Sequence, residues 1–313
     1  MTNALRGSRE RRLAFIAWIV VCLVWGTTYL AIRVSLESIP VALLAGLRWA
    51  AAGVILTAVL PLMGEKLPPV RTWGSIAIAG FLMAVIGNGG VVWAEQYVAS
   101  GLAAVVVAMV PFWVVMIEAV LPGGERLTRQ TLGGLAVGFV GIVILVWPQL
   151  FGGGREGQQF LFGIISLLLA CLGWAIGTAY TKRTSTNANP LAAAALQMLF
   201  SGAMLIAIGT ATGEWSRLAF TSRTITAMVY LVLVGSIVGY SSYVYALKYL
   251  PVSTVSLYAY VNPVIAVVLG TLFLSEPFSM RIVFASALVF AGIAIVRSTP
   301  RAASSAKAEK KAA

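Results

Sequence analysis

Long apolar stretches, each followed by a short polar or glycine- and proline-rich segment, succeed one another along the whole chain. A helix that crosses a bilayer needs about 20 predominantly apolar residues. Dividing the chain at its charges, prolines and glycine clusters predicts ten such helices. Their expected ranges are 13–34, 40–62, 73–95, 99–121, 129–148, 161–181, 190–211, 224–247, 253–274 and 280–297. The pattern therefore predicts an all-α integral membrane protein with ten transmembrane helices.

The segments between these helices are too short to form a further domain. Residues 1–12 are a basic N-terminus, and the apolar stretch after them is longer than the core of a signal peptide. We therefore expect that stretch to be retained as the first span. Residues 149–160 are expected to link two groups of five helices. Residues 298–313, with charges scattered among alanines and serines, are expected to form a disordered basic tail.

The composition supports a membrane protein, because 60% of the residues are hydrophobic and 10% are charged. Soluble domains are about 45–50% apolar and about 25% charged. The net charge of +12 comes from basic residues that lie between the apolar stretches, so the expected partner is a lipid bilayer and not a nucleic acid. Asp and His are absent, and there are only two cysteines. The common hydrolase triads and zinc sites are thereby excluded, and we predict no catalytic residue, metal or cofactor.

The distribution of basic residues predicts the orientation. With the N-terminus in the cytoplasm, sixteen of the 22 Lys and Arg residues lie in cytoplasmic segments and five lie outside, while Arg48 lies within a span. Cytoplasmic loops carry an excess of Lys and Arg. We therefore expect one fixed orientation in a cell inner membrane, with both termini cytoplasmic.

The chain contains an internal repeat. When the sequence is shifted by 149 to 152 residues, Trp, Tyr and Pro residues of the first half fall on the same residue types in the second. The pairs are Trp25 with Trp174, Tyr97 with Tyr249, and Pro111 with Pro263. Each half, 13–148 and 161–297, holds five predicted spans, and because five is odd the second half enters the membrane in the opposite sense. Such inverted repeats are typical of secondary transporters, whose substrate site lies between the halves.

These residues resemble the EamA-type members of the drug/metabolite transporter superfamily. The resemblance rests on two copies of one motif and on two short elements near the N-terminus. They are Ala94, Tyr97, Ala103-Ala104, Pro111, Gly138 and Gly141; Ala246-Leu247-Lys248-Tyr249, Asn262-Pro263 and Gly292; and Trp25-Gly26 and Leu47-Arg48-Trp49. The resemblance implies ten helices in two inverted five-helix repeats that export small organic metabolites. Within the superfamily the chain looks most like the bacterial aromatic amino acid exporters of the YddG type.

Polar and aromatic residues deep in the spans are the candidates for substrate contact. Buried amides need hydrogen-bond partners, which can be a neighbouring helix or a substrate. Deep aromatic rings can pack in the core, face lipid or line a cavity for an amphipathic ligand. The predicted substrate-binding residues are Trp25, Tyr29, Asn88, Trp93, Trp174, Tyr243, Tyr258 and Asn262.

Two prolines and two charges complete the candidate residues. Pro111 and Pro263 lie mid-membrane at equivalent places of the repeat, where the missing donor of a proline bends a helix. They are predicted to bend spans four and nine during gating, although packing alone would also explain them. Arg48 and Glu95 both lie toward the outer face. They are predicted to be structural charges that form a pair, or snorkel.

The sequence thus predicts a secondary transporter that exports amphipathic small metabolites, with aromatic and other neutral amino acids first. One alternative is a drug or nucleotide-sugar carrier of the same superfamily, although a nucleotide sugar calls for more cations than Arg48. A distant alternative is a membrane-embedded enzyme. We expect a monomer or a weak homodimer.

Overall fold

The computed structural model describes residues 2–121, 128–151, 154–184, 189–276 and 279–297, and every regular element in these ranges is a helix. Seven helices are long and apolar enough to cross a membrane, and they correspond to predicted spans one to four and six to eight. Three shorter apolar helices correspond to predicted spans five, nine and ten. The prediction of an all-α membrane protein is therefore confirmed.

The first half of the chain contains one span with a π-helical centre and one divided span. Its elements are α1 (Thr2–Ser35), α2 (Val41–Val59), η1 (Leu60–Met63), η2 (Val70–Thr72), α3 (Trp73–Gly80), the π-helix η3 (Phe81–Asn88), α4 (Gly89–Ala94), α5 (Ser100–Val107), α6 (Val110–Val120) and α7 (Arg129–Phe151). The third predicted span is thus one continuous run from η2 to α4 with a π-helical centre. The fourth is divided into α5 and α6.

The second half follows the same plan. Its elements are α8 (Gly154–Thr184), α9 (Pro190–Ala211), η4 (Glu214–Arg217), α10 (Ser222–Tyr230), the π-helix η5 (Leu231–Val238), α11 (Gly239–Tyr249), α12 (Val252–Val255), α13 (Tyr258–Leu274) and α14 (Met280–Arg297). A π-helix is rare and often marks a functional site. Here one lies at the centre of the third span of each half, which gives the repeat seen in the sequence a structural counterpart.

Several helices are longer than predicted. The helix α1 begins at Thr2, so it includes residues expected to form a separate N-terminus. The helices α7 and α8 extend through most of the expected linker, in which only residues 152–153 lie outside the described ranges. The expected tail, residues 298–313, also lies outside them.

The two paired prolines have different positions in their helices. Pro111 lies in the first turn of α6, directly after the break between α5 and α6. Pro263 lies inside α13, and the break in its span is nearly two turns earlier, between α12 and α13. Both spans are therefore interrupted, as the missing proline donor favours. The two prolines thus differ in their place, since one starts a helix and the other lies inside one, and their role in gating stays a prediction.

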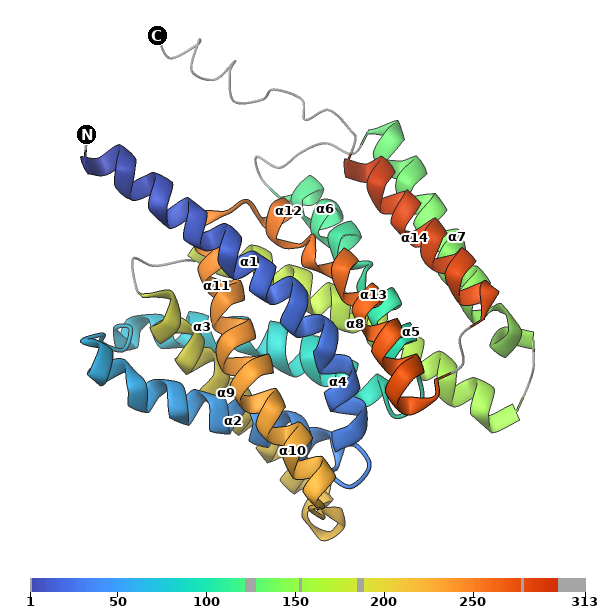
Figure 1. Ribbon diagram of the computed structural model, residues 1–313, viewed down its shortest axis with the longest axis horizontal. Helices are drawn as coiled ribbons and strands as arrows, with labels where there is room; N and C mark the ends of the chain where they lie inside the picture. Colours follow the sequence, from blue (N-terminus) through green and yellow to red (C-terminus); the bar gives the residue numbers. More distant parts are fainter. Residues whose placement is uncertain (1, 122–127, 152–153, 185–188, 277–278, 298–313) are drawn as a thin grey trace.

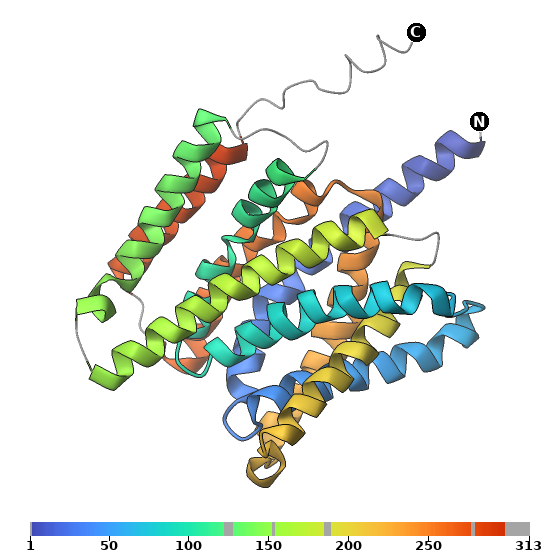
Figure 2. The same cartoon turned by 180° about the vertical axis from the view of Figure 1, so that it is seen from behind.

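The two halves interlock and do not form separate domains. The closest helix pairs join one half to the other: α2 packs on α9, α7 on α14, and α1 on α13 and α11. Each of the two buried apolar clusters also takes residues from both halves. Figure 1 shows α7 and α14 side by side at one edge of the molecule, away from its centre. From behind, α8 crosses the run formed by α3, η3 and α4 (Figure 2).

Glutamates from the segments that follow α9 and α13 bind the starts of two other helices. The carboxylate of Glu214 accepts hydrogen bonds from the main-chain nitrogens of Ala42 (3.2 Å) and Leu43 (2.8 Å) at the start of α2. The carboxylate of Glu276 does the same for Ser100 (2.8 Å) and Gly101 (3.1 Å) at the start of α5. An anion near a helix N-terminus is favourable because it satisfies free donors and faces the positive end of the helix dipole.

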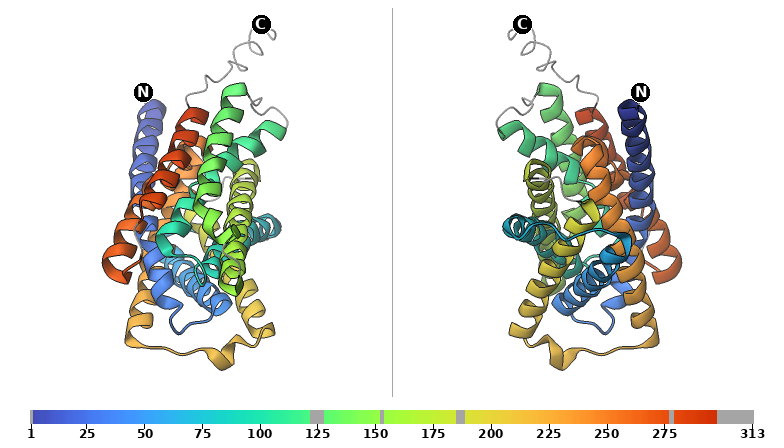
Figure 3. Two further views of the ribbon diagram at one scale, coloured as in Figure 1. Left: turned by 90° about the vertical axis from the view of Figure 1, so that its right-hand side faces the viewer. Right: turned by 90° about the vertical axis from the view of Figure 1, so that its left-hand side faces the viewer.

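Large apolar side chains remain exposed around the outside, as expected for helices that face lipid. Leu23, Phe139, Leu169 and Leu272 are each more than half exposed. The start of α1 and the end of α14 lie toward one end of the molecule, and the connection between α9 and α10 lies at the other (Figure 3). Within the described residues, the first helix therefore begins and the last helix ends on the same side of the molecule.

Candidate functional site

A cavity of about 60 Å³ lies at the centre of the molecule, between the two halves. Its wall is built by α1, α2, η3, α4, α5, α6, α8 and α13. Six of the predicted substrate-binding residues line it: Trp25, Tyr29, Asn88, Trp174, Tyr258 and Asn262. The structure therefore brings together residues that are more than 230 positions apart in the sequence.

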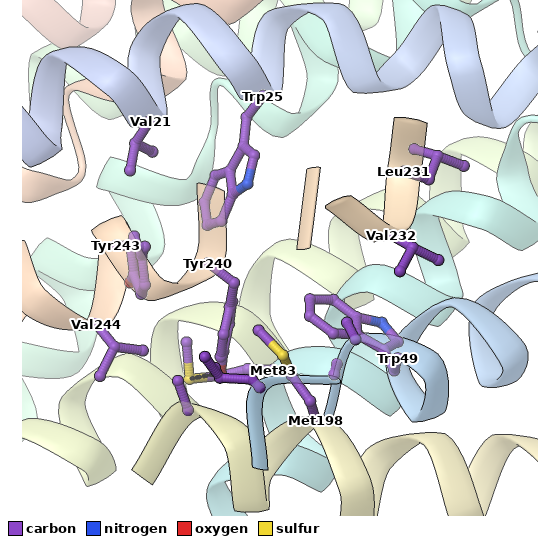
Figure 4. Packing of buried hydrophobic residues seen from close by; sticks show 14 of the residues in the cluster. Val21, Trp25, Trp49, Met83, Met198, Leu231, Val232, Tyr240, Tyr243 and Val244 are labelled. Atoms are coloured by element: carbon purple, nitrogen blue, oxygen red, sulfur yellow. Dashed lines mark hydrogen bonds between the residues drawn. The ribbon is translucent and has the colours of Figure 1, made fainter. Parts of the chain in front are cut away.

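Aromatic rings form one wall of this central cavity. The ring centroid of Trp25 lies 5.3 Å from that of Trp174 and 4.9 Å from that of Tyr258, both in edge-to-face arrangements. Tyr243 stacks on Trp25 at 5.1 Å from the outer side of the cavity. Figure 4 shows Trp25 reaching down from α1 toward Tyr243 and Tyr240. Such ring contacts add about 0.5–1.5 kcal/mol each beyond burial, so the cluster holds its rings in fixed orientations.

The paired tryptophans each contact the π-helical span of the opposite half. The indole nitrogen of Trp25 donates to the main-chain oxygen of Gly235 in η5 (3.1 Å). Trp174 packs against Gly87 in η3, where a Cβ would lie 3.0 Å from the indole ring. A π-helix shifts the hydrogen-bond register and leaves a carbonyl free to accept from a side chain. Each π-helix therefore seats one aromatic ring at the boundary between the halves.

The two amides of the site are held by neighbouring groups. The side-chain oxygen of Asn88 accepts from the indole nitrogen of Trp49 (3.1 Å). The side-chain nitrogen of Asn262, assigned from its surroundings, donates to the main-chain oxygens of Cys22 (3.0 Å) and Tyr258 (3.1 Å). Asn262 is thus an interhelical bridge between α13 and α1 that also faces the cavity.

Two predicted substrate-binding residues do not line the cavity. Tyr243 lies behind Trp25 and shares a hydrogen bond with Thr178 (2.7 Å). Trp93 is 37% exposed and packs edge-to-face on Tyr97 at 5.2 Å, on the outside of the molecule. Trp93 thus lies away from the substrate site predicted for it, whereas Tyr243 supports the site from behind.

Both predicted structural charges are buried. Arg48 is 3% exposed, and its Nε donates to the hydroxyl of Ser236 (2.7 Å). Glu95 is fully buried, and neither of its carboxylate oxygens has a hydrogen-bond partner among the described residues. The side chain of Arg33 donates to the main-chain oxygen of Glu95. No hydrogen bond joins Arg48 to Glu95, because the guanidinium points toward η5 and lines the central cavity.

A second cavity, of about 220 Å³, lies between α3, the ends of α8 and α11 and the start of α9. Residues that line it include Ser75, Thr181, Lys182, Gln197 and Lys248. Within the part of the chain that the structure describes, no three His, Cys, Asp or Glu side chains gather where a metal ion could be held.

A closed layer separates the two cavities, and the sequence analysis did not single it out. Buried residues lie between the lining of one cavity and that of the other: Met83 in η3, Thr178 in α8 and Tyr240 in α11. Figure 4 shows Met83 beside Tyr240. The sulfur of Met83 accepts weak contacts from the hydroxyl of Tyr240 (3.9 Å) and the amide of Gln197 (3.9 Å). Gln197, a lone amide in the apolar α9, was the one signal of this layer in the sequence.

Comparison with known proteins agrees with this architecture. The model of the EamA-like transporter family matches residues 12–147 and again residues 161–298. The uncharacterized inner membrane transporter YedA of Escherichia coli is 37% identical over 82% of this chain and 81% of its own length. A probable amino-acid metabolite efflux pump of Escherichia coli is 29% identical over 71% of this chain and 74% of its own length.

Structure comparison gives the same result. A protein crystal structure aligns with a TM-score of 0.66 at 21% identity, over 90% of this chain and 96% of that chain, which shows a shared fold. The family model covers nearly the whole chain in two copies, and their boundaries agree with the two halves of the repeat. This chain, a multi-pass membrane transporter, therefore belongs to the EamA-like transporter family.

Proposed function

We propose that the protein is a secondary transporter of the inner membrane that exports amphipathic small metabolites, first among them aromatic and other neutral amino acids. The observation that carries this proposal is the central cavity, whose wall combines the rings of Trp25 and Trp174 with the amides of Asn88 and Asn262. A zwitterion with an aromatic side chain offers a ring for the first pair and hydrogen-bonding groups for the second. The similarity to an amino-acid metabolite efflux pump supports the same substrate class.

The mechanism we propose is alternating access between two inverted five-helix repeats, which together form ten transmembrane helices. The central cavity of about 60 Å³ is smaller than the roughly 300–1,000 Å³ of typical ligand pockets. The second cavity, about 220 Å³, is closed from it by the layer of Met83, Thr178 and Tyr240. Substrate passage therefore requires that layer to open and the rings around Trp25 to separate. The breaks before Pro111 and Pro263 are the places where spans four and nine would bend.

The test is counterflow of radiolabelled amino acids in proteoliposomes, with competition by a panel of metabolites. Phenylalanine, tryptophan and leucine are expected to exchange, and aromatic amino acids, the substrates of YddG-type exporters, are expected to compete best. If no amino acid exchanges and a drug or a nucleotide sugar does, the alternative carrier of the same superfamily replaces this proposal.

Mutations are expected to distinguish the contacts to the side chain of the substrate from the contacts to its amino and carboxyl groups. Trp174→Ala should lower the apparent affinity for phenylalanine about tenfold relative to that for alanine, because only the ring of phenylalanine contacts the lost indole. Asn262→Ala should lower the apparent affinity for both amino acids about 2- to 10-fold, because the amide is expected to bind the amino or carboxyl group that all amino acids share. Trp73→Ala, at a ring that packs on Phe200 away from the cavity, is the control. Equal effects of Trp174→Ala on phenylalanine and alanine would remove Trp174 from the site.

We also propose that both termini are cytoplasmic, as the excess of basic residues on one side predicts. Cysteine introduced at Ser216 should be labelled by a membrane-impermeant thiol reagent from the periplasm, and cysteine at Lys66 should react only after the membrane is opened. Both positions are exposed, and the native Cys22 and Cys171 are buried, so the background is low. Labelling of Lys66→Cys and not Ser216→Cys from the periplasm would reverse the orientation.

A further inference from the structure

The one charged side chain among the residues that line the central cavity is the guanidinium of Arg48. It projects from α2, is 3% exposed, and shares the cavity wall with Tyr29, Asn88 and Asn262. Charged residues at membrane depth are costly, and they mark substrate or ion pathways when they face an internal cavity.

The structure holds this guanidinium in one orientation but leaves part of it free. Its Nε donates to the hydroxyl of Ser236 in η5 (2.7 Å), and its central carbon lies 5.0 Å above the ring of Trp49. Gly235 leaves room for it, since a Cβ there would lie 3.2 Å from Nη2. Its Nη1 is buried and has no hydrogen-bond partner. Protein groups therefore hold one side of the guanidinium, and one of its N–H donors has no hydrogen-bond partner.

No carboxylate is hydrogen-bonded to Arg48 within the described residues. Glu95, its expected partner, does not bond to it. A buried cation with an unsatisfied donor and no hydrogen-bonded anion lowers stability, unless a ligand supplies the missing acceptor. A carboxylate is the matching group, because it accepts two parallel hydrogen bonds from a guanidinium. A phosphate would accept the same bonds but brings up to two charges, whereas this cavity offers one cation among aromatic and amide groups.

We propose that Arg48 binds the carboxylate of the transported molecule and that the substrates are consequently monocarboxylates, with Ser236 and Trp49 positioning the guanidinium. This inference rests on the proposed function and narrows it. The amino group of an amino acid then lies toward the oxygens of the opposite wall, and the side chain lies against the rings of Trp25 and Trp174. Arg48 is thus a binding residue and not a structural charge.

The experiment uses two pairs of probes that differ only at the carboxylate: phenylalanine with phenylalaninamide, and 3-phenylpropionate with 3-phenylpropanamide. Inhibition of amino acid counterflow and thermal stabilisation of the purified full chain are measured for each. The parent protein is expected to prefer each acid over its amide by about 10- to 100-fold, the usual effect of a hydrogen bond to a charged group. Arg48→Gln should remove this preference, and Arg48→Lys should keep part of it. Arg217→Gln, at an exposed loop position, is the control.

The outcomes separate this inference from the proposed function. If no amino acid exchanges but 3-phenylpropionate stabilises the parent and not Arg48→Gln, the amino acid assignment fails and the carboxylate site stands. If the parent responds equally to acids and amides, or if folded Arg48→Gln keeps the parent's preference, the carboxylate site is overturned. The comparison within the parent protein remains decisive even if Arg48→Gln does not fold.

Discussion

Replacing Gly202 by leucine is expected to prevent the protein from accumulating in a folded form. Gly202 lies on α9 where it crosses α2, and a Cβ at this position would lie 2.7 Å from the Cα of Ala50. Gly46 and Gly53 on α2 make similar close approaches to the main chain of α9, at Ile206 and Leu199. Helices in membranes associate through small residues that let their backbones meet. Because the obstacle is backbone, the helices must separate, and the cost exceeds the roughly 1–3 kcal/mol of ordinary overpacking.

The measurement is the yield of monodisperse protein in mild detergent, followed by its thermal midpoint. Gly202→Ala should give an intermediate result, since it adds one carbon and not four. Gly74→Leu is the matched control, because a Cβ at Gly74 would have no neighbour within 4 Å. A Gly202→Leu protein with the parent's midpoint would show that α2 and α9 do not pack as described.

Removing the ring of Trp25 is expected to have the second-largest effect. Trp25 contacts Trp174, Tyr243 and Tyr258 and donates to the main chain of Gly235. Truncating a buried tryptophan to alanine costs roughly 3–5 kcal/mol. Trp25→Ala should therefore lower the thermal midpoint and abolish counterflow, because the hydrogen bond to η5 and one wall of the cavity are both lost.

A graded comparison distinguishes these two losses. Trp25→Phe keeps a ring but removes the hydrogen bond to Gly235, which is worth about 0.5–1.5 kcal/mol. It should restore most of the stability and leave transport impaired. Trp215→Ala, at a half-exposed ring outside the cavity, should resemble the parent protein in both measurements. Full transport by stable Trp25→Ala would exclude Trp25 from the substrate path.

The positions of the spans could be predicted from hydropathy, and α9 and α14 begin and end where expected. The π-helices at η3 and η5 could not, because a π-helix differs from an α-helix in hydrogen-bond register and has no hydropathy signal. At the break between α5 and α6, residues 108–109, only a bend at Pro111 was predicted. The cause of the break, Pro111, was visible, but proline is tolerated both at the start of a helix and inside one in a membrane.

The residue types of the site could be predicted better than the direction in which each side chain faces. In a soluble helix the polar face shows which side is outside, but in a membrane both the lipid and the core are apolar. The pattern therefore could not separate Trp25, which lines the cavity, from Trp93, which lies outside. For the same reason Arg48 was predicted to pair with Glu95 or to snorkel. Only the packing of α2 against η5 shows that it faces the cavity.

The interlocking of the halves has a consequence for biosynthesis. Gly46 on α2 is translated and inserted long before its partner Gly202 on α9 exists. At about 5–20 residues per second, the intervening chain takes on the order of 8–30 seconds to make. During that interval lipid covers the face of α2 that later packs against α9, and Arg48 lacks its hydrogen bond to Ser236. The first half therefore has to persist in the bilayer as separate helices, and the fold is completed only when the last spans arrive.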